Sequence, residues 1–220
     1  MENQSYLEIL KLNAELKHSL EEAKQYKVTI LSNIIIHQIK EILEFSLRVE
    51  NINAVINIGD YDNIIQDSMK VVGSNVFIVF WELCNLFEGL NYKIEQLEDD
   101  QINKIAEKTC SEIDLTFKNL ETSSLVLVNK FSSAIFPFPS KTKSNFDKLA
   151  NILNKHISNF APKNVKLVDL ERVFYNIGVH KSIDLRYYYS SKALYTIDFF
   201  KAYSRLVKPF IMSEKVLQKK

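Results

Sequence analysis

The chain has 220 residues, of which 46% are hydrophobic and 25% are charged, the profile of an ordinary soluble globular protein. Its formal net charge of +1 gives no electrostatic reason to expect nucleic acid or an anionic membrane as a partner. No uncharged apolar run reaches about 18 residues, which excludes a transmembrane helix. Cys84 and Cys110 form no Cys-x-x-Cys pair, and the polar start MENQSYLEIL is no signal peptide. We therefore expect free thiols and a cytoplasmic location.

Segments with helical spacing of apolar residues alternate along the chain with short apolar runs. At the start, Leu12, Leu16 and Leu20 are spaced by four residues with Glu and Lys between them, which predicts an amphipathic helix. Runs such as YKVTIL and NVFIVF are rich in β-branched and aromatic residues and end at polar residues, as buried strands do. In chain order, the sequence predicts helix 5–25, strand 26–31, helix 34–49, strand 53–58, helix 63–69, strand 75–80, helix 97–119, strand 124–128, helix 144–159, strand 165–169 and helix 197–208.

This alternation favours a parallel sheet with helices on both faces, because strands buried on both faces are continuously apolar. We predict an α/β fold, a three-layer sandwich with a five-stranded parallel sheet of the flavodoxin-like type. No internal linker is evident, so we expect one α/β domain over residues 26–211, with a helix over 1–25 packed on it and a tail over 212–220. Ligands in such folds bind beyond the carboxyl ends of the strands.

Four polar residues near these strand ends are candidate catalytic residues. Ser32 and Asn33 end the first strand, where Ser32 could be a nucleophile or either residue could cap the next helix. Asn129 follows the fourth strand and could donate a hydrogen bond to a developing oxyanion, although Asn is also common where a strand ends. His180, in the segment after the fifth strand, could be a general base.

Other residues near the strand ends are candidate substrate-binding residues. Gly59, Tyr61 and Asn63 follow the second strand, as turn formers first and ligand contacts second. Glu82 follows the third strand and could orient a base, accept a ligand hydroxyl or cap a helix. No residues have the spacing of metal ligands, and no Gly-rich phosphate loop occurs. We therefore expect no metal and no cofactor in this domain.

Residues 182–196, SIDLRYYYSSKALYT, combine one carboxylate, two cations and four tyrosines. This mixture suits the wall of a polar cleft, where rings stack and long cations reach an anionic or oxygen-rich ligand. We expect Arg186 and Lys192 to bind a carboxylate or a phosphate, with Asp184 orienting Arg186. The tyrosines would supply walls and hydroxyl donors. The candidate substrate-binding residues of this segment are Asp184, Arg186, Tyr188, Tyr189, Lys192 and Tyr195.

The blocks YKVTILSN, GDYDN and DLRYYYSSKALYT, in this order and spacing, resemble the N-terminal SGNH-hydrolase-like (GDSL-type) domain of FkbH-like proteins. The resemblance covers residues 5–211. In the first block, Ser32 and Asn33 fall in the family's Leu-Ser-Asn motif, and Gly59, Tyr61 and, one place later, Asn63 meet its Gly-x-Tyr-Asn-like turn. The family's C-terminal block, Asp-x-Arg-x-aromatic-Tyr-x-x-Lys-x-x-Tyr-Ser/Thr, is matched by Asp184, Arg186, Tyr188, Tyr189, Lys192, Tyr195 and Thr196.

The resemblance implies an SGNH-like, flavodoxin-like fold. It also implies a part in moving a glyceryl-type or other small acyl unit from a phosphorylated donor to a carrier, in polyketide or surface-polysaccharide biosynthesis. The implied partners are an acyl carrier protein or a small acyl donor. FkbH-like proteins also have a C-terminal HAD-type phosphatase-like domain, the only part for which Mg is expected. Its Asp-x-Asp-x-Thr motif is absent from this chain, so that domain could be a separate subunit.

The usual SGNH signature is incomplete in this chain. No Gly-Asp-Ser block precedes the helix after the first strand, and Asn33 takes the nucleophile position in an ungapped overlay. No Asp-x-x-His pair follows the fifth strand. Two functions therefore stay open. One is an acyltransferase or esterase-like enzyme; the other is a catalytically degenerate scaffold that docks a carrier protein or the phosphatase-like partner. In the scaffold, a salt bridge between Asp184 and Arg186 would lock the C-terminal helix onto the sheet. A flavodoxin-like binder of a phosphorylated ligand is a third alternative, against which the missing Gly-rich loops count.

Overall fold

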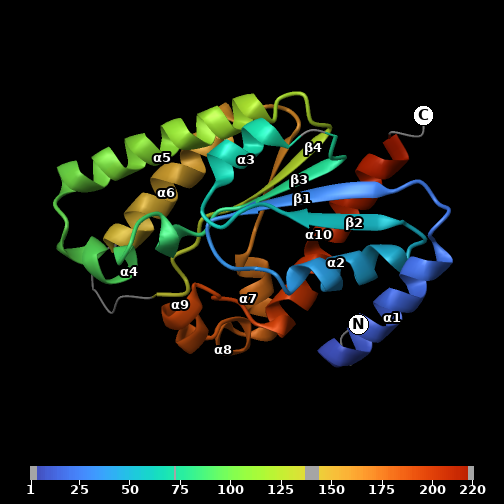
Figure 1. The fold of residues 1–220 in the computed structure, drawn as a ribbon. Coiled ribbons are helices and arrows are strands. Elements are labelled where there is room, and N and C mark those ends of the chain that lie inside the picture. Colours follow the sequence, from blue (N-terminus) through green and yellow to red (C-terminus); the bar gives the residue numbers. More distant parts are fainter. Residues whose placement is uncertain (1–3, 72, 137–143, 218–220) are drawn as a thin grey trace.

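Five parallel strands form the centre of the molecule, in the order β2-β1-β3-β4-β5 (Figure 1). The computed structural model describes residues 4–71, 73–136 and 144–217. Its strands are β1 (Tyr26–Ser32), β2 (Ala54–Ile58), β3 (Val76–Phe80), β4 (Leu125–Asn129) and β5 (Val165–Val168). Each strand overlaps one of the five predicted segments, so the predicted α/β fold with a five-stranded parallel sheet is confirmed. The order 2-1-3-4-5 is that of flavodoxin-like folds, in which the strand order reverses between β1 and β3.

Helices cover both faces of this sheet and complete a three-layer sandwich. Figure 1 shows α3, α5 and α6 on one face and α2, with α1 outside it, on the other; α10 packs beside α2. The helices are α1 (Tyr6–Ser19), α2 (Ile39–Arg48), α3 (Ile64–Lys70), α4 (Leu90–Lys93), α5 (Asp99–Asn119), α6 (Asn145–Phe160), α7 (Glu171–Ile177), α8 (Val179–Ser182), α9 (Leu185–Ser191) and α10 (Ile197–Leu217), with short 3₁₀ turns η1 (Leu83–Asn85) and η2 (Ile94–Gln96).

The observed helices differ from the predicted ones mainly at their ends. The first helix stops at Ser19, and the helix predicted from residue 34 begins at Ile39. The last helix continues to Leu217 although Pro209 lies inside it, so residues 212–217, which we expected to form a tail, are helical. Proline disfavours a helix interior, but Ile211 beyond it is fully buried, and this packing favours continuing the helix. Residues 1–3 and 218–220, at the two ends of the predicted domain division, lie outside the described residues.

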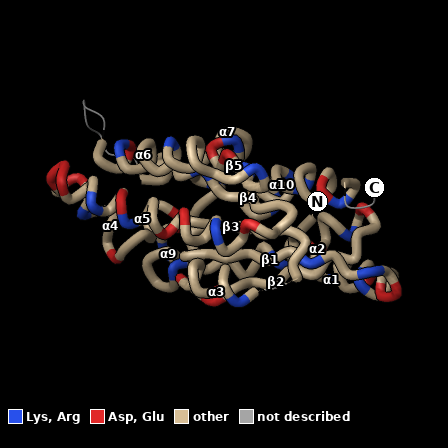
Figure 2. Tube along the Cα trace, turned by 90° about the horizontal axis from the view of Figure 1, so that it is seen from above, with Lys and Arg blue, Asp and Glu red and all other residues tan. Residues whose placement is uncertain are grey.

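The surface carries mixed charge. Lys and Arg alternate with Asp and Glu along the outer helices, and neither sign forms a long continuous stretch (Figure 2). Cys84 and Cys110 are both free thiols, as expected. Among the described residues, no helix combines the length and the apolar character that crossing a membrane requires.

A buried polar cluster attaches α1 and α2 to β2, the strand at one edge of the sheet. The Arg48 guanidinium donates to the Ala54 carbonyl at 2.8 Å and to Asn13 Oδ1, on α1, at 2.7 Å. The Glu44 carboxylate accepts from the Ile56 amide at 2.9 Å and lies 3.3 Å from Arg48. These side chains therefore hydrogen-bond to the Ala54 carbonyl and the Ile56 amide at the edge of β2, which would otherwise be unpaired.

Replacing Arg48 should show how much this buried polar cluster contributes to the free energy of unfolding. Because Arg48→Met leaves the Glu44 carboxylate buried without its cation, we expect it to lower the free energy of unfolding by about 3–5 kcal/mol. Adding Glu44→Gln removes the unpaired charge but keeps an acceptor for Ile56, so the double variant should recover part of the loss. Urea denaturation measures both. Lys40→Met, an exposed change on the same helix, should stay within about 0.5 kcal/mol of the wild type; an equal loss there would contradict the assignment.

Candidate functional site

One buried side chain, that of Asn33, joins the carboxyl ends of β1 and β3. Its Nδ2 donates to the carbonyls of Glu82 at 2.9 Å and Asn85 at 3.1 Å, and its Oδ1 accepts from the Glu82 amide at 2.7 Å. Asn85 Nδ2 returns a hydrogen bond of 2.5 Å to the Asn33 carbonyl. An amide has two N–H donors, and both are engaged inside the protein. Asn33 thus holds two strand ends together and has no donor left for a ligand.

Ser32 is oriented in the same inward way. Its hydroxyl donates to the Ile34 carbonyl at 3.0 Å and accepts from the Ile34 amide at 3.1 Å, forming a local turn, and the residue is 4% exposed. His180 lies exposed on α8, and its ring has no hydrogen-bond or ion-pair partner in the described part of the chain. The structure therefore does not bring the predicted nucleophile and the predicted base together.

Asn129, the predicted oxyanion donor, lies beneath the last helix. It is fully buried, and its Oδ1 accepts a hydrogen bond of 3.0 Å from the hydroxyl of Tyr203 on α10. Its Nδ2 is buried and has no partner among the described residues. The amide points into the protein, so its observed role is to hold α10 against the end of β4.

Glu82, after β3, is a buried carboxyl connected to the C-terminal segment. Its Oε2 accepts from the Tyr195 hydroxyl at 2.5 Å, and its Oε1 accepts from the Leu83 amide at 3.1 Å. Burial raises the pKa of Glu82 to about 7, against the opposing effect of these hydrogen bonds. Tyr195 stacks on Phe199 with ring centroids 3.7 Å apart, and burial raises the pKa of its hydroxyl well above the ordinary value. Glu82 and Tyr195, two predicted substrate-binding residues, are thus hydrogen-bonded to each other.

Tyr188 and Lys192 also pack against the protein. The Tyr188 hydroxyl donates to the Cys84 carbonyl at 3.1 Å, and its ring is buried. Lys192 ends α9 in a left-handed conformation with φ of 60°. Its ammonium lies 5.2 Å from the centroid of the Tyr188 ring, within cation–π range. The structure thus shows Lys192 against a ring of its own helix. The hydrogen bond from Tyr188 to the Cys84 carbonyl holds α9 on the segment after β3.

Asp184 and Arg186 form a local pair at the start of α9. Asp184 accepts from the Arg186 backbone amide at 3.0 Å, from Nε at 3.1 Å and from Nη2 at 2.6 Å. These hydrogen bonds lower the pKa of Asp184. Asp184 therefore fixes the direction of Arg186, but the Arg186 side chain is 88% exposed and both residues belong to one helix start. The expectation that this pair locks the last helix onto the sheet is wrong. Two other hydrogen bonds connect the C-terminal segment to the strand ends, from Tyr195 to Glu82 and from Tyr203 to Asn129.

The remaining predicted residues shape turns or lie at the surface. A Cβ on Gly59 would lie 2.6 Å from Asp67 Oδ2, so a larger residue here would displace the Asp67 carboxylate. Asn63 donates to Asp67 Oδ1 at 2.8 Å. Tyr61 and Tyr189 are about half exposed or more, at 45% and 61%, and their hydroxyls accept hydrogen bonds from the amides of Asn85 and Asn91.

Two hollows lie beside this network. The smaller one, of about 200 Å³, lies between α3, α5 and the strand switch point, and Asn33, Asp62, Trp81, Asn85, Lys108 and Glu112 border it. The larger one, of about 520 Å³, lies between α9 and the β1–α2 connection, and its polar side chains include Gln38, Asp184, Tyr187, Tyr195 and Asp198. Neither Arg186 nor Lys192 lines either hollow. No group of three acidic, His or Cys side chains able to hold a metal occurs among the described residues.

Sequence reasoning missed Asn85, Cys84 and Tyr203, which complete the network. Asn85 and Cys84 follow a strand end within three residues of Glu82. Their position predicts a place at the carboxyl edge of the sheet, because residues that follow a strand end lie there. Tyr203 gave no such signal, since it lies in the middle of a long helix.

The strand order and the three layers define a flavodoxin-like α/β domain. No protein-family model and no curated protein matches the chain by sequence. The fold is similar to that in the crystal structure of the N-terminal part of the protein BF1531 from Bacteroides fragilis, which contains a phosphatase domain complexed with Mg, with a TM-score of 0.71 and 17% sequence identity. The match covers 91% of this chain and 54% of that one, so this chain spans about half the length of its neighbour. At this identity the likeness establishes the fold alone.

Glu82→Gln tests the buried carboxyl. Because the pKa of Glu82 rises from its ordinary value of 4.5 to about 7 on folding, the folded state keeps a proton that the unfolded state releases between these pH values. The free energy of unfolding therefore falls as pH rises through this window. The uncharged Gln avoids this loss, so relative to wild type the variant should gain roughly 3 kcal/mol between pH 4 and pH 8.

Urea denaturation across this pH range provides the measurement. Glu107→Gln, an exposed change on α5, is the matched control and should follow the wild-type pH curve. Parallel curves for Glu82→Gln and the wild type would show that Glu82 titrates normally.

Proposed function

We propose that this chain is a catalytically degenerate SGNH-hydrolase-like domain of the FkbH-like type, which docks a HAD-type phosphatase-like partner rather than hydrolysing an ester or thioester. The observation that carries the proposal is that three of the candidate catalytic side chains are buried and hydrogen-bonded within the protein. Ser32, Asn33 and Asn129 each hydrogen-bond to the protein itself, and none is more than 4% exposed. A nucleophile must instead reach its base and the reacting carbonyl.

The choice of partner is supported by the fold comparison. A protein part with a similar fold contains a phosphatase domain, and this chain covers 54% of it. The family resemblance of residues 182–196 also joins an SGNH-like domain to a phosphatase-like one. An acyl carrier protein is the alternative partner.

The exposed face of α9 is the docking surface that we propose. Tyr187 is 62% exposed and Tyr189 is 61% exposed, and the Arg186 side chain beside them is 88% exposed. Tyr and Arg are enriched among the residues that dominate binding energy in protein interfaces. These rings stand on a helix that is held to the domain by buried contacts of Tyr188, so they are presented on a fixed support.

One observation favours the enzymatic alternative, an acyltransferase or esterase-like activity on a glyceryl-type or other small acyl unit. Tyr195 lines the hollow of about 520 Å³, and its hydroxyl is bonded to Glu82, whose pKa of about 7 suits acid–base chemistry. In this alternative Glu82 would act through Tyr195. Because the carboxyl itself is buried behind the ring, the scaffold function is favoured.

The catalytic part of the proposal is tested with a carrier protein loaded with a glyceryl thioester. Incubation with the wild-type chain should leave the rate of acyl loss, followed by intact mass, at the protein-free value, because the hydroxyl of the candidate nucleophile Ser32 is buried and bonded to the Ile34 backbone. Ser32→Ala, Asn33→Ala and Glu82→Gln should not change it. Turnover at least about tenfold above background that Ser32→Ala or Glu82→Gln removes would establish an enzyme and overturn the scaffold.

The docking part is tested by binding of a HAD-type phosphatase-like protein and, in parallel, of an acyl carrier protein. Tyr187→Ala and Tyr189→Ala should each weaken binding of the phosphatase-like protein about tenfold or more, as expected for interface anchors. Tyr175→Ala removes a ring from α7 that is 85% exposed, more than either tyrosine of α9, and this control should leave binding unchanged. Binding of the carrier protein alone, or equal loss in all three variants, would contradict the proposed surface.

A further inference from the structure

The smaller hollow at the carboxyl edge, of about 200 Å³, lies where the strand order reverses between β1 and β3. Residues of α3, of α5 and of the segment after β3 border it, and Figure 1 shows α3 and α5 side by side on one face of the sheet. None of the described residues of α9, which carries the proposed docking surface, borders it. Pockets for drug-sized ligands have volumes of about 300–1,000 Å³, so a ligand of this hollow is a smaller molecule.

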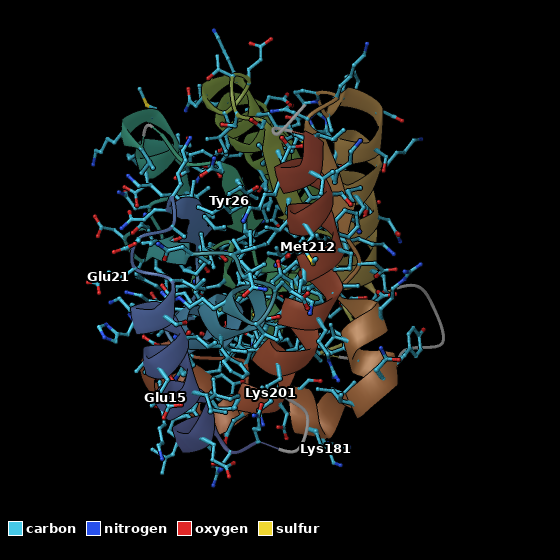
Figure 3. The ribbon with its side chains drawn as sticks, turned by 90° about the vertical axis from the view of Figure 1, so that its right-hand side faces the viewer. Glu15, Glu21, Tyr26, Lys181, Lys201 and Met212 are labelled. Atoms are coloured by element: carbon cyan, nitrogen blue, oxygen red, sulfur yellow. The ribbon has the colours of Figure 1, made fainter. Side chains whose placement is uncertain are left out.

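The opposite, amino end of the sheet is covered by the last helix. Figure 3 shows this end, with Tyr26, the first residue of β1, and Met212 of α10 labelled. Tyr26 is buried, the Lys215 ammonium lies 5.7 Å from the centroid of its ring, and Met212 packs against the hydrophobic core. The hollow thus lies at the edge of the sheet that ligands use in folds of this type.

Trp81 gives this hollow a hydrogen-bond donor that has no partner. The residue directly follows β3, borders the hollow and is only 6% exposed. Its indole Nε1 makes no hydrogen bond within the described part of the chain and remains accessible to solvent. Because so little of Trp81 is exposed, this access lies at the hollow. An unpartnered donor on a side chain so buried is unusual, and it leaves a hydrogen bond for a ligand to complete.

Acceptor oxygens border the same hollow. Asn85 is 8% exposed and uses its N–H donors on the Asn33 carbonyl and the Tyr61 hydroxyl, while its Oδ1 is accessible and has no partner among the described residues. Asp62 precedes α3 with a left-handed φ of 55°, and its backbone amide donates to the Ser32 carbonyl at 3.1 Å. This hydrogen bond fixes the Asp62 backbone beside the end of β1. The hollow therefore offers acceptors as well as a donor.

The charged side chains of the hollow are two carboxylates and one ammonium, which gives a net charge of −1. Lys108 and Glu112 lie one turn apart on α5 at 3.6 Å, so their charges largely cancel. The Asp62 carboxylate has no ion-pair partner within the described residues. Burial and the Glu112 charge raise the pKa of Asp62, against the opposing effect of Lys108. An anionic ligand would therefore meet like charge.

We infer that this hollow binds a small, neutral, polyhydroxylated molecule of the polyol or monosaccharide type. A hydroxyl both donates and accepts, so neighbouring hydroxyls can accept from the Trp81 N–H and donate to Asn85 Oδ1 and Asp62. An anionic group can only accept, and Asp62 repels it. An ammonium can only donate, so it leaves the Trp81 N–H without a partner. This inference goes beyond the docking function and does not depend on it, because none of these residues belongs to α9.

The single tryptophan of the chain serves as a reporter at this site. A ¹H–¹⁵N correlation NMR spectrum of the full chain contains one indole N–H signal, that of Trp81. The chain is titrated at low ionic strength with D-sorbitol, a neutral polyol, and with D-gluconate, an anion with a similar chain of hydroxyls. Sorbitol should shift the indole signal in a saturable way. It should bind about threefold or more tightly than gluconate, because Asp62 repels the carboxylate.

Two variants test the assigned contacts. Trp81→Phe keeps a ring but removes the N–H, so it should weaken sorbitol binding about three- to tenfold. Saturation transfer to the ligand measures this, because the reporter is lost. Folding, checked by circular dichroism, should be retained, since Nε1 has no hydrogen bond to lose. Asp62→Asn removes the charge and keeps a residue that adopts a positive φ readily, so it should abolish the preference for sorbitol over gluconate.

Asp100→Asn is the matched control, because it removes an exposed carboxylate of the same type from α5, outside the hollow. It should bind both probes as the wild type does. A shift that grows without saturation, or sorbitol binding that Trp81→Phe leaves unchanged, would overturn the site. Equal affinities for sorbitol and gluconate in the wild type would overturn the assignment of a neutral ligand.

Discussion

The side-chain amide of Asn33 is the contact on which the arrangement of the carboxyl edge depends. Parallel strands leave their carboxyl ends side by side, but the segments that follow them must be held by other groups. The Asn33 side chain hydrogen-bonds to the backbone amide and the backbone carbonyl of Glu82, and to the backbone carbonyl of Asn85. Because the Glu82 backbone is fixed, its carboxyl can meet the Tyr195 hydroxyl from the C-terminal segment. One amide thus places β1, the turn after β3 and the start of α10 relative to one another.

This arrangement explains why a scaffold function fits the geometry better than hydrolysis. Catalytic groups need spare hydrogen-bonding capacity and a path to substrate, whereas a buried polar network is stable only when its members satisfy one another. Here such a network occupies the strand ends, with the Asn129 Nδ2 as its one donor that lacks a partner among the described residues. Aromatic packing covers it: Phe80, Tyr195, Phe199 and Tyr203 form edge and stacked contacts. The raised pKa of Glu82 reflects the cost of placing a carboxyl in this environment.

The sequence predicts the sheet better than the site, for a physical reason. A strand buried on both faces needs a continuous apolar run, and runs such as residues 75–80 have no equally good alternative. A polar residue at a strand end has two alternatives of similar cost, since it can face a ligand or satisfy the backbone. The direction of the Ser32 hydroxyl depends on the Ile34 backbone, and that of Asn33 depends on residues about fifty positions away. The extension of α10 past Pro209 likewise cannot be predicted from the sequence, because the burial of Ile211 depends on tertiary packing.

Where an anion can bind depends on which cations are already paired within the protein. The charges of residues 182–196 are close together in sequence, and this closeness lets opposite charges neutralise each other. Arg186 pairs with Asp184 two residues away, and Lys192 lies over a ring on its own helix. Both cations of this segment are therefore engaged by groups two to four residues away, which leaves less of their charge for an anionic ligand than the sequence alone suggests.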